Sequence, residues 1–360
     1  MIVSFDPAIF ISRDASTQEC LAEILIEISR KQYHLFSLEG LSGVFLDGKM
    51  NFIFETNPIV ENYFSKHNLK IFKEYITRIS VSGGTYITQL HKNYLKKLKI
   101  GNGTNDIKPD LALKILNEKS KVVIENGIND WQFLKGICEK YTNQKKRKSI
   151  YKLLKEAIKD FFIESYNAGG HGEITKIVED ERTTGVYKDI EKYKLMALFD
   201  SDRTSSTAMS PYHSKIEYFT GKNRSTITIV DYVCNEAADV IIWHILYKKK
   251  LENYVPLNQL YKIAKSITPV QKTILSSKNP QELDFIEYGK PRPTKPNLFD
   301  IGMTDNDIKD KFPETFLNSF SYTELEERCE HHKVDHTLPN GQIEQITEME
   351  EILLKMAKII

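Results

Sequence analysis

The chain has 360 residues, 41% of them hydrophobic and 28% charged, which are the proportions of a globular protein large enough for two domains. Its 50 Lys and Arg residues against 49 Asp and Glu residues give a formal net charge of +1, so any basic surface for a nucleic acid has to be local. Four cysteines without a CxxC pair argue against a disulfide framework and a Cys-based zinc site. With no signal-peptide pattern and no apolar run near the roughly 18 residues that span a bilayer, we expect a cytoplasmic protein away from membranes.

Residues 1–115 mix strand-like and helical runs, and they predict an N-terminal α+β domain of unknown role. Strand-like runs lie at 44–55 and 79–88, whereas apolar residues recur at helical spacing over 20–29. The stretch 101–110 is rich in the turn-forming residues Gly, Asn, Asp and Pro, and it indicates a domain boundary nearby.

Residues 116–256 alternate between short apolar runs and helical segments. The predicted strands lie at 122–126, 161–166, 195–199 and 239–247. The segment 130–141 is amphipathic and helical, and a Gly-rich turn after the second strand enters another helix. Such alternation is typical of βαβ units, so we expect an α/β core with a parallel sheet flanked by helices.

Residues 257–360 predict a mainly helical C-terminal extension. It contains a Pro-rich loop at 289–297 and ends in an amphipathic helix over 348–360. This last helix and the N-terminal domain are candidate docking surfaces for a partner, and packing within the chain is the alternative for both.

Acidic side chains follow two of the predicted strands. Glu125 ends the first apolar run, and Asp200 and Asp202 form a DxD motif directly after the third. Because the carboxyl ends of parallel strands share one edge of a sheet, these carboxylates are expected to converge. Neighbouring carboxylates repel one another unless a cation neutralises them, and hard oxygen ligands select Mg²⁺ or Mn²⁺. The pattern predicts a catalytic metal site, with a DxD of no chemical role and a helix N-cap at Asp130 as the alternatives.

The ordered pattern of these motifs resembles the TOPRIM domain. The first motif of that family ends a strand with Glu and continues Gly-x-x-Asp, and here the run from Glu125 to Asp130 is one residue longer. The second motif is a strand followed by DxD, as at Asp200 and Asp202. The Gly-rich turn at 169–172 is similar to one in the nuclease branch, and the segment at 246–256 is similar to one in TOPRIM proteins of phage defence. The resemblance covers residues 115–256, less than half of the chain.

The resemblance implies a divalent-metal-dependent endonuclease that cleaves phosphodiester bonds in DNA or RNA, tRNA included. It also implies a toxic effector of bacterial antiviral defence, such as the nucleases of the overcoming-lysogenization-defect type. An ABC-type ATPase is the implied partner, and a homo-oligomer stays open. The catalytic residues would be Glu125, Asp200 and Asp202, and the ligands of Mg²⁺ or Mn²⁺ would be Glu125, Asp130, Asp200, Asp202 and Glu252.

Basic and histidine side chains near these motifs are further candidates. The predicted contacts to nucleic-acid phosphates are Lys248, Lys249, Lys250 and His171. A solvated strand end and a loop histidine without a chemical role are the respective alternatives. The basic run at 145–148 is interpreted as a solvated helix face, with binding of a nucleic-acid backbone as the alternative. The Cys and His residues within 329–336 have zinc-ligand types, but we interpret them as a polar helix end.

A second candidate function is that of a binding protein and not of an enzyme. The chain would then be a non-catalytic TOPRIM-like binding or regulatory subunit of a defence or nucleic-acid complex. The one-residue insertion in the first motif favours this alternative.

Overall fold

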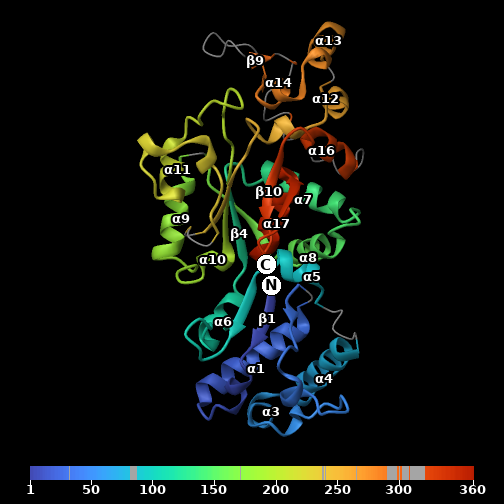
Figure 1. The fold of residues 1–360 in the computed structure, drawn as a ribbon, viewed down its shortest axis with the longest axis vertical. Coiled ribbons are helices and arrows are strands. Elements are labelled where there is room, and N and C mark those ends of the chain that lie inside the picture. Colours follow the sequence, from blue (N-terminus) through green and yellow to red (C-terminus); the bar gives the residue numbers. More distant parts are fainter. Residues whose placement is uncertain are drawn as a thin grey trace.

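The computed structural model describes residues 1–31, 33–81, 87–170, 172–236, 239, 241–264, 266–289, 298–299, 301, 308 and 321–360. The molecule is elongated, with the N-terminal helices at one end, a parallel sheet in the middle and the first helices after residue 256 at the other end (Figure 1). Among the described residues, no helix is both long and apolar enough to cross a membrane.

The N-terminal part is built on a three-stranded sheet. Strand β1 (Ile2–Phe5) lies between β2 (Leu35–Phe36) and β3 (Lys97–Ile100), and both pairings are parallel. This arrangement is α/β, whereas the sequence predicted α+β. The helices of this part are η1 (Pro7–Ile11), α1 (Ala15–Arg30), α2 (Ser42–Phe45), η2 (Phe54–Thr56), α3 (Pro58–Tyr63), α4 (Lys66–Val81), α5 (Gln89–Tyr94) and α6 (Pro109–Asn117).

Helix α1 confirms the helical run predicted at 20–29, but the strand-like run at 44–55 does not form a strand. Within 44–55, a turn held by the Asp47 side chain leaves one bridge, between Leu46 and Phe52, flanked by α2 and η2. The apolar residues of this run pack as an aromatic cluster around Phe72 instead. The run at 79–88 begins as the end of α4, and residues 82–86 lie outside the described residues.

The central sheet contains four parallel strands in the order β5-β4-β6-β7. They confirm the four predicted apolar runs: β4 (Ser120–Ile124), β5 (Ile163–Asn167), β6 (Leu195–Phe199) and β7 (Ile242–Ile245). Helices connect them, as the alternating pattern predicted. These elements are α7 (Asn129–Tyr141), α8 (Lys148–Lys159), α9 (Ile174–Thr183), α10 (Glu191–Lys194), α11 (His213–Thr220), η3 (Arg224–Thr226) and η4 (Ile229–Asp231).

The central strands are buried on both faces, because successive side chains of a strand point to opposite sides. Val122 and Met196 pack on one face with residues of α7 and α8. Val123 and Ala197 pack on the other face with residues of α9 and α11, in a cluster that continues into the N-terminal part. The N-terminal part and the central sheet therefore share one apolar core.

The C-terminal part packs against the central sheet and also contains strands that the sequence did not predict. An antiparallel hairpin joins β10 (Lys333–Thr337) to β11 (Ile343–Thr347), and β8 (Glu287–Tyr288) pairs with β9 (Leu298–Phe299). The predicted last helix is α17, and its buried apolar side chains contact α8, so packing within the chain covers it. Residues 290–297 of the Pro-rich loop lie outside the described residues. The helices here are η5 (Leu251–Tyr254), α12 (Leu257–Ile263), α13 (Pro269–Ser277), α14 (Pro280–Asp284), α16 (Tyr322–Cys329) and α17 (Glu348–Lys358).

Candidate functional site

The predicted carboxylates lie at the carboxyl edge of the central sheet. Glu125 directly follows β4 and Asp200 directly follows β6, and these two strands are parallel neighbours in which Val123 pairs with Ala197. Both side chains therefore leave the sheet at the same edge, which is where ligands bind in open parallel sheets.

Three of the predicted acidic residues line one small cavity at this edge. Glu125, Asp130 and Asp200 surround a space of about 10 Å³ together with apolar side chains from β4, β6 and the segment after β7. Asp130 also lines a neighbouring cavity of the same size, and there it is joined by Glu252. A space of this size holds about one water molecule, or one ion of similar radius. Four acidic side chains thus gather along two adjacent cavities.

The DxD segment is held by the backbone that follows β7. The buried Ser201 hydroxyl donates to the Lys248 carbonyl at 2.8 Å, and the Asp202 backbone N–H donates to the Lys249 carbonyl at 2.9 Å. Asp202 has a φ of +48°, which is a left-handed conformation that costs a non-glycine residue free energy. The backbone is therefore not extended at Asp202. The rule that residues two apart in a strand point the same way does not apply to Asp200 and Asp202.

Two residues that the sequence did not indicate complete the site. Lys215 of α11 is almost fully buried, and its Nζ lies 2.8 Å from Glu125 Oε1. Tyr212, just before α11, lies with its ring centroid 4.4 Å from the same Nζ. Burial raises the pKa of Tyr212, and so do a hydrogen bond to Asp202 and the charges of Asp202, Glu125 and Asp200. The tyrosine oxygen therefore lies within electrostatic range of all three predicted catalytic carboxylates.

The donor chemistry of this site fits a hard cation, but its arrangement does not. In the part of the chain that the structure describes, no group of three or more His, Cys, Asp and Glu side chains has the geometry to hold a metal ion. Lysines are the cations that lie closest to the carboxylates: Lys215 at Glu125, and Lys250 at 3.9 Å from Asp202. Lysine side chains therefore balance part of the negative charge of the site.

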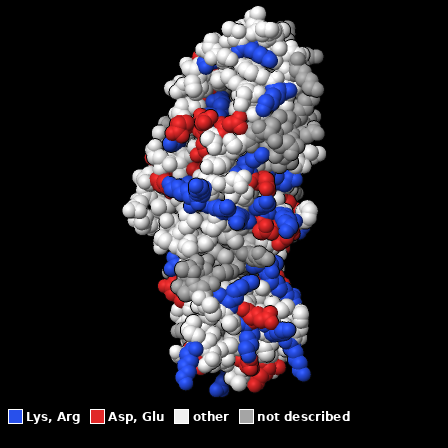
Figure 2. Space-filling view, turned by 90° about the vertical axis from the view of Figure 1, so that its right-hand side faces the viewer, with Lys and Arg blue, Asp and Glu red and all other residues white. Residues whose placement is uncertain are grey.

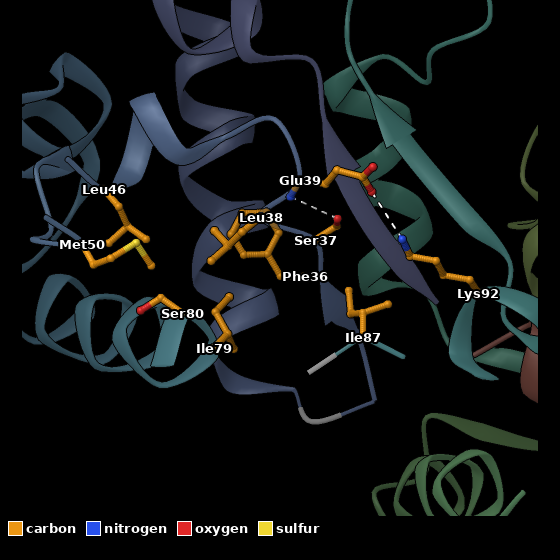
Figure 3. A pocket seen from close by; sticks show the side chains of 10 residues that line it. All are labelled: Phe36, Ser37, Leu38, Glu39, Leu46, Met50, Ile79, Ser80, Ile87 and Lys92. Carbon is orange, nitrogen blue, oxygen red and sulfur yellow. Dashed lines mark hydrogen bonds and ion pairs between the residues drawn. The ribbon is translucent and has the colours of Figure 1, made fainter. Parts of the chain in front are cut away.

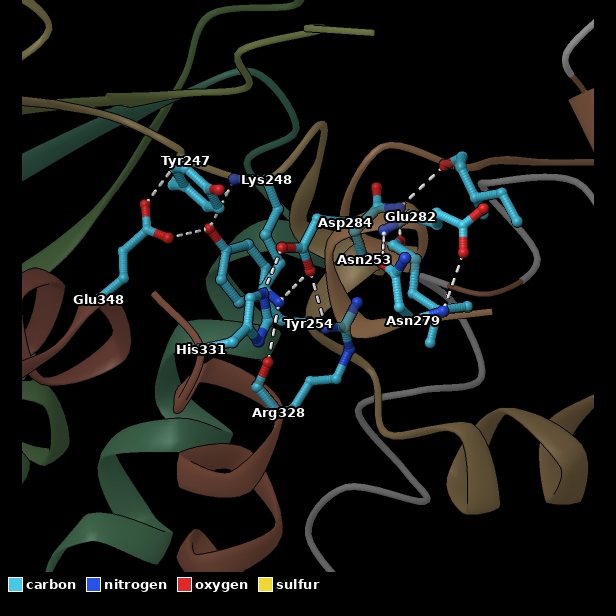
Figure 4. A network of polar contacts seen from close by, with 12 residues as sticks. Tyr247, Lys248, Asn253, Tyr254, Asn279, Glu282, Asp284, Arg328, His331 and Glu348 are labelled. Atoms are coloured by element: carbon cyan, nitrogen blue, oxygen red, sulfur yellow. Dashed lines mark hydrogen bonds and ion pairs between the residues drawn. The ribbon is translucent and has the colours of Figure 1, made fainter. Parts of the chain in front are cut away.

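The three consecutive lysines after β7 have different surroundings. Lys248 is 1% exposed, and its ammonium group donates to Asp284 and to the Arg328 carbonyl (Figure 4). This burial argues against the phosphate contact predicted for Lys248. Lys249 is also buried, with its Nζ 3.8 Å from Glu287, whereas Lys250 lies beside Asp202. Of the three, Lys250 is the one whose ammonium group lies beside a predicted site residue, and His171 lies outside the described residues.

The histidines of the segment 329–336 have three separate environments. His331 Nε2 lies 2.5 Å from Asp284 Oδ2, and His332 stacks on the Tyr247 ring. His336 Nδ1 lies 2.8 Å from a Glu351 oxygen. These side chains face different partners. Helix α16 ends at Cys329 and His336 lies in β10, so only the beginning of the segment is the helix end that the sequence predicted.

The basic run at 145–148 is only partly a solvated face. Arg147 is 1% exposed and donates to Glu350 at 2.6 Å, and its guanidinium also lies 2.6 Å from Glu344. Lys145, Lys146 and Lys148 are exposed. Figure 2 shows basic side chains across the middle of one face, interspersed with acidic ones. This mixture agrees with the net charge of +1.

Two larger cavities are present among the described residues, and the second shares Leu246 with the acidic cavity. One of about 380 Å³ in the N-terminal part has mainly apolar walls, among them Phe36, Leu46 and Ile79, with the Glu39–Lys92 ion pair at its edge (Figure 3). Another of about 460 Å³ lies between the segment after β7 and the C-terminal hairpin. The sequence predicted neither, because each is formed by segments far apart in the chain.

Comparison with known proteins adds no further assignment. No family model, no curated protein and no solved structure matches the chain.

Proposed function

We propose that this chain is a metal-dependent endonuclease with a TOPRIM-like core, acting on phosphodiester bonds of DNA or RNA with Mg²⁺ or Mn²⁺. The observation that carries the proposal is the single cavity lined by Glu125, Asp130 and Asp200 at the carboxyl edge of a parallel sheet. Oxygen donors of this kind select those two ions. The proposal extends, through the resemblance, to a toxic effector of phage defence in the cytoplasm, with an ABC-type ATPase as partner.

The residues of this chain have separate roles in that proposal. The carboxylates of Glu125 and Asp200 supply the negative charge of the cavity, and Asp130 extends it toward Glu252. Lys250 lies beside Asp202 and is placed to bind a substrate phosphate by charge. A hydrogen bond to Asp202 raises the pKa of Tyr212, which puts the tyrosine oxygen beside that carboxylate.

A second candidate function is a non-catalytic subunit that binds nucleic acid or a partner. The Lys215–Glu125 ion pair favours it, because a carboxylate that is already neutralised has no need of a metal ion.

The test is cleavage of plasmid DNA and of tRNA by the purified chain with Mn²⁺, Mg²⁺ or EDTA. We expect cleavage with either metal, none with EDTA, and none by the Asp200→Ala variant. Asp335→Ala is the matched control, because this exposed aspartate removes the same charge and bonds only to Gln345 among the described contacts. Protein that binds either nucleic acid but leaves it intact under all conditions would support the non-catalytic subunit instead.

A further inference from the structure

A buried arginine lines the cavity of about 460 Å³ between the segment after β7 and the C-terminal hairpin. Arg203 is 2% exposed, and its guanidinium donates to three backbone carbonyls, those of Ser206, Ala208 and Tyr247. Among the described residues, no Asp or Glu forms an ion pair with this guanidinium. Backbone dipoles therefore solvate its charge, but no anion balances it.

A buried cation in this chain otherwise has a carboxylate beside it or is able to lose its charge. Arg147 Nη1, for example, lies 2.6 Å from Glu350 Oε1. Lys194 is buried without a carboxylate in the described part of the chain, but burial lowers the pKa of its ammonium group, so this lysine can be neutral. A guanidinium keeps its proton in proteins, and a buried charge without a counter-charge is costly. Arg203 is thus a fixed positive charge at the wall of a cavity.

Acidic side chains also line this cavity, but they have other partners. Glu348 Oε1 lies 2.9 Å from His244 Nε2, and Glu351 Oε1 lies 3.6 Å from Lys355 Nζ. Asp335 is exposed, so water screens its charge. The two glutamates are therefore engaged with basic groups of their own and leave the guanidinium without a counter-charge.

We propose that this cavity binds a small organic anion, with the carboxylate or phosphate group beside Arg203 and an apolar or ring-shaped body against Tyr232, Val233 and Val334. The volume lies in the range of small-molecule sites, and these walls are aromatic or apolar. A guanidinium has more N–H donors than the three carbonyls use, and carboxylate and phosphate oxygens are its best acceptors. The site involves none of the acidic residues of the proposed endonuclease and goes beyond that function.

The cavity opens to solvent beside Tyr232. Val233 lines the cavity and is 70% exposed, so a ligand has access past this residue. The Tyr232 ring centroid lies 6.0 Å from the guanidinium carbon, and the Tyr232 hydroxyl accepts the Ser210 N–H at 2.8 Å, which holds the ring in place. An aromatic surface and a positive charge thus lie close together, as an anion with a ring requires.

The experiment is thermal unfolding of the full chain in buffer with EDTA and paired probes. Adenosine monophosphate carries a phosphate and indoleacetate a carboxylate, and adenosine and indoleacetamide are their neutral counterparts. We expect one of the two anions to raise the melting temperature while its neutral counterpart does not, because a ligand stabilises the folded state that binds it. The anion that does so identifies the head group.

Variants then locate the binding. Arg203→Met should weaken the affinity for that anion at least about tenfold in calorimetry, whereas Arg224→Met, at an exposed position, should not. Val233→Asp leaves the guanidinium intact and adds a negative charge at the cavity, so it should weaken binding as well and serves if the methionine variant does not fold. Val230→Asp is its matched control, because Val230 is 82% exposed and is not among the described lining residues.

Three outcomes would overturn the proposal. They are no shift with either anion, an equal shift with an anion and its neutral counterpart, and equal affinity in Val233→Asp and Val230→Asp. The assay contains neither a divalent metal nor a nucleic acid, so none of these outcomes bears on the proposed endonuclease.

Discussion

Replacing Asp284 tests how the segment after β7 is held in place. This aspartate of α14 is fully buried, and three basic side chains surround its carboxylate. Lys248 Nζ donates to Oδ1, Arg328 Nη1 lies 2.7 Å from the same oxygen, and His331 Nε2 lies 2.5 Å from Oδ2 (Figure 4). The Asp284 carbonyl also accepts the Lys249 N–H at 2.9 Å. The side chain and backbone of one residue thus anchor the strand end that carries the lysines.

Replacing Asp284 by Asn removes one charge and leaves the volume unchanged. Lys248 and Arg328 then remain buried without their counter-charge, a change that typically costs about 3–5 kcal/mol of unfolding free energy. An unfolding entropy of about 2.1 cal/mol/K per residue gives about 0.76 kcal/mol/K for the 360 residues. We therefore expect the melting temperature to fall by about 4–7 °C in a single-step transition.

The assay is thermal unfolding followed by circular dichroism, with Glu55→Gln as the matched control. Glu55 forms an ion pair with Lys73 in which both side chains are about half-exposed, so removal of its charge should cost less than about 1 kcal/mol. Double replacement of Asp284 by Leu and Lys248 by Met should recover part of the loss, because it removes both members of one buried pair. Equal losses in Asp284→Asn and Glu55→Gln would refute the anchoring role.

Three further predictions test other parts of the chain. Burial raises the pKa of the Glu344 carboxyl, but hydrogen bonds led by that from Lys146 outweigh it and hold the pKa at about 2. This stabilisation is complete above the ordinary value of 4.5 and is lost as the pH falls toward 2, so Glu344→Gln should flatten the pH dependence of the melting temperature in that window. At Asp202, with φ +48°, Gly should be more stable than Ala by about 1 kcal/mol in denaturant titration, because both remove the carboxylate and only Gly relieves the backbone. A Cβ at Gly127 would lie 2.4 Å from a side-chain atom at the end of β5, so Gly127→Ala should lower the melting temperature, whereas Gly172→Ala, which has open space, should not.

The central sheet could be predicted from sequence because its signal is local. Each strand overlaps a short run that contains apolar residues, and the run at 195–199 coincides with β6 residue for residue. The prediction of a strand at 44–55 was wrong because it used the same local signal. The phenylalanines of this run are apolar, but they pack around Phe72 and not in a sheet. Burial of an aromatic side chain in a cluster or in a strand leaves the same pattern in the sequence. The residues that pack against such a run decide whether it forms a strand or joins an aromatic cluster.

The carboxylates of the site were accessible to prediction, whereas their counter-charges were not. Glu125 and Asp200 each end an apolar run, and a parallel sheet brings such ends together whatever the loops contain. Lys215 lies 90 positions from Glu125, and no sequence motif around it marks it as a partner of that carboxylate. One weak signal was present: a lysine amid the aromatic residues of 212–219 has little solvent to face.

The C-terminal part holds in place the segment on which the site depends. Glu348, at the start of α17, is 2% exposed and accepts hydrogen bonds from the Tyr247 N–H at 2.6 Å and from Tyr254, and its Oε1 lies 2.9 Å from His244 Nε2. Together with Asp284, it holds both ends of the segment whose carbonyls bind the DxD loop. Each of these anchors is a buried carboxylate, and a buried carboxylate is stable only while its partners stay in place. The position of Asp200 and Asp202 therefore depends on residues more than 80 positions further along the chain, so a core defined by the motifs alone would lack the contacts that hold its own DxD segment.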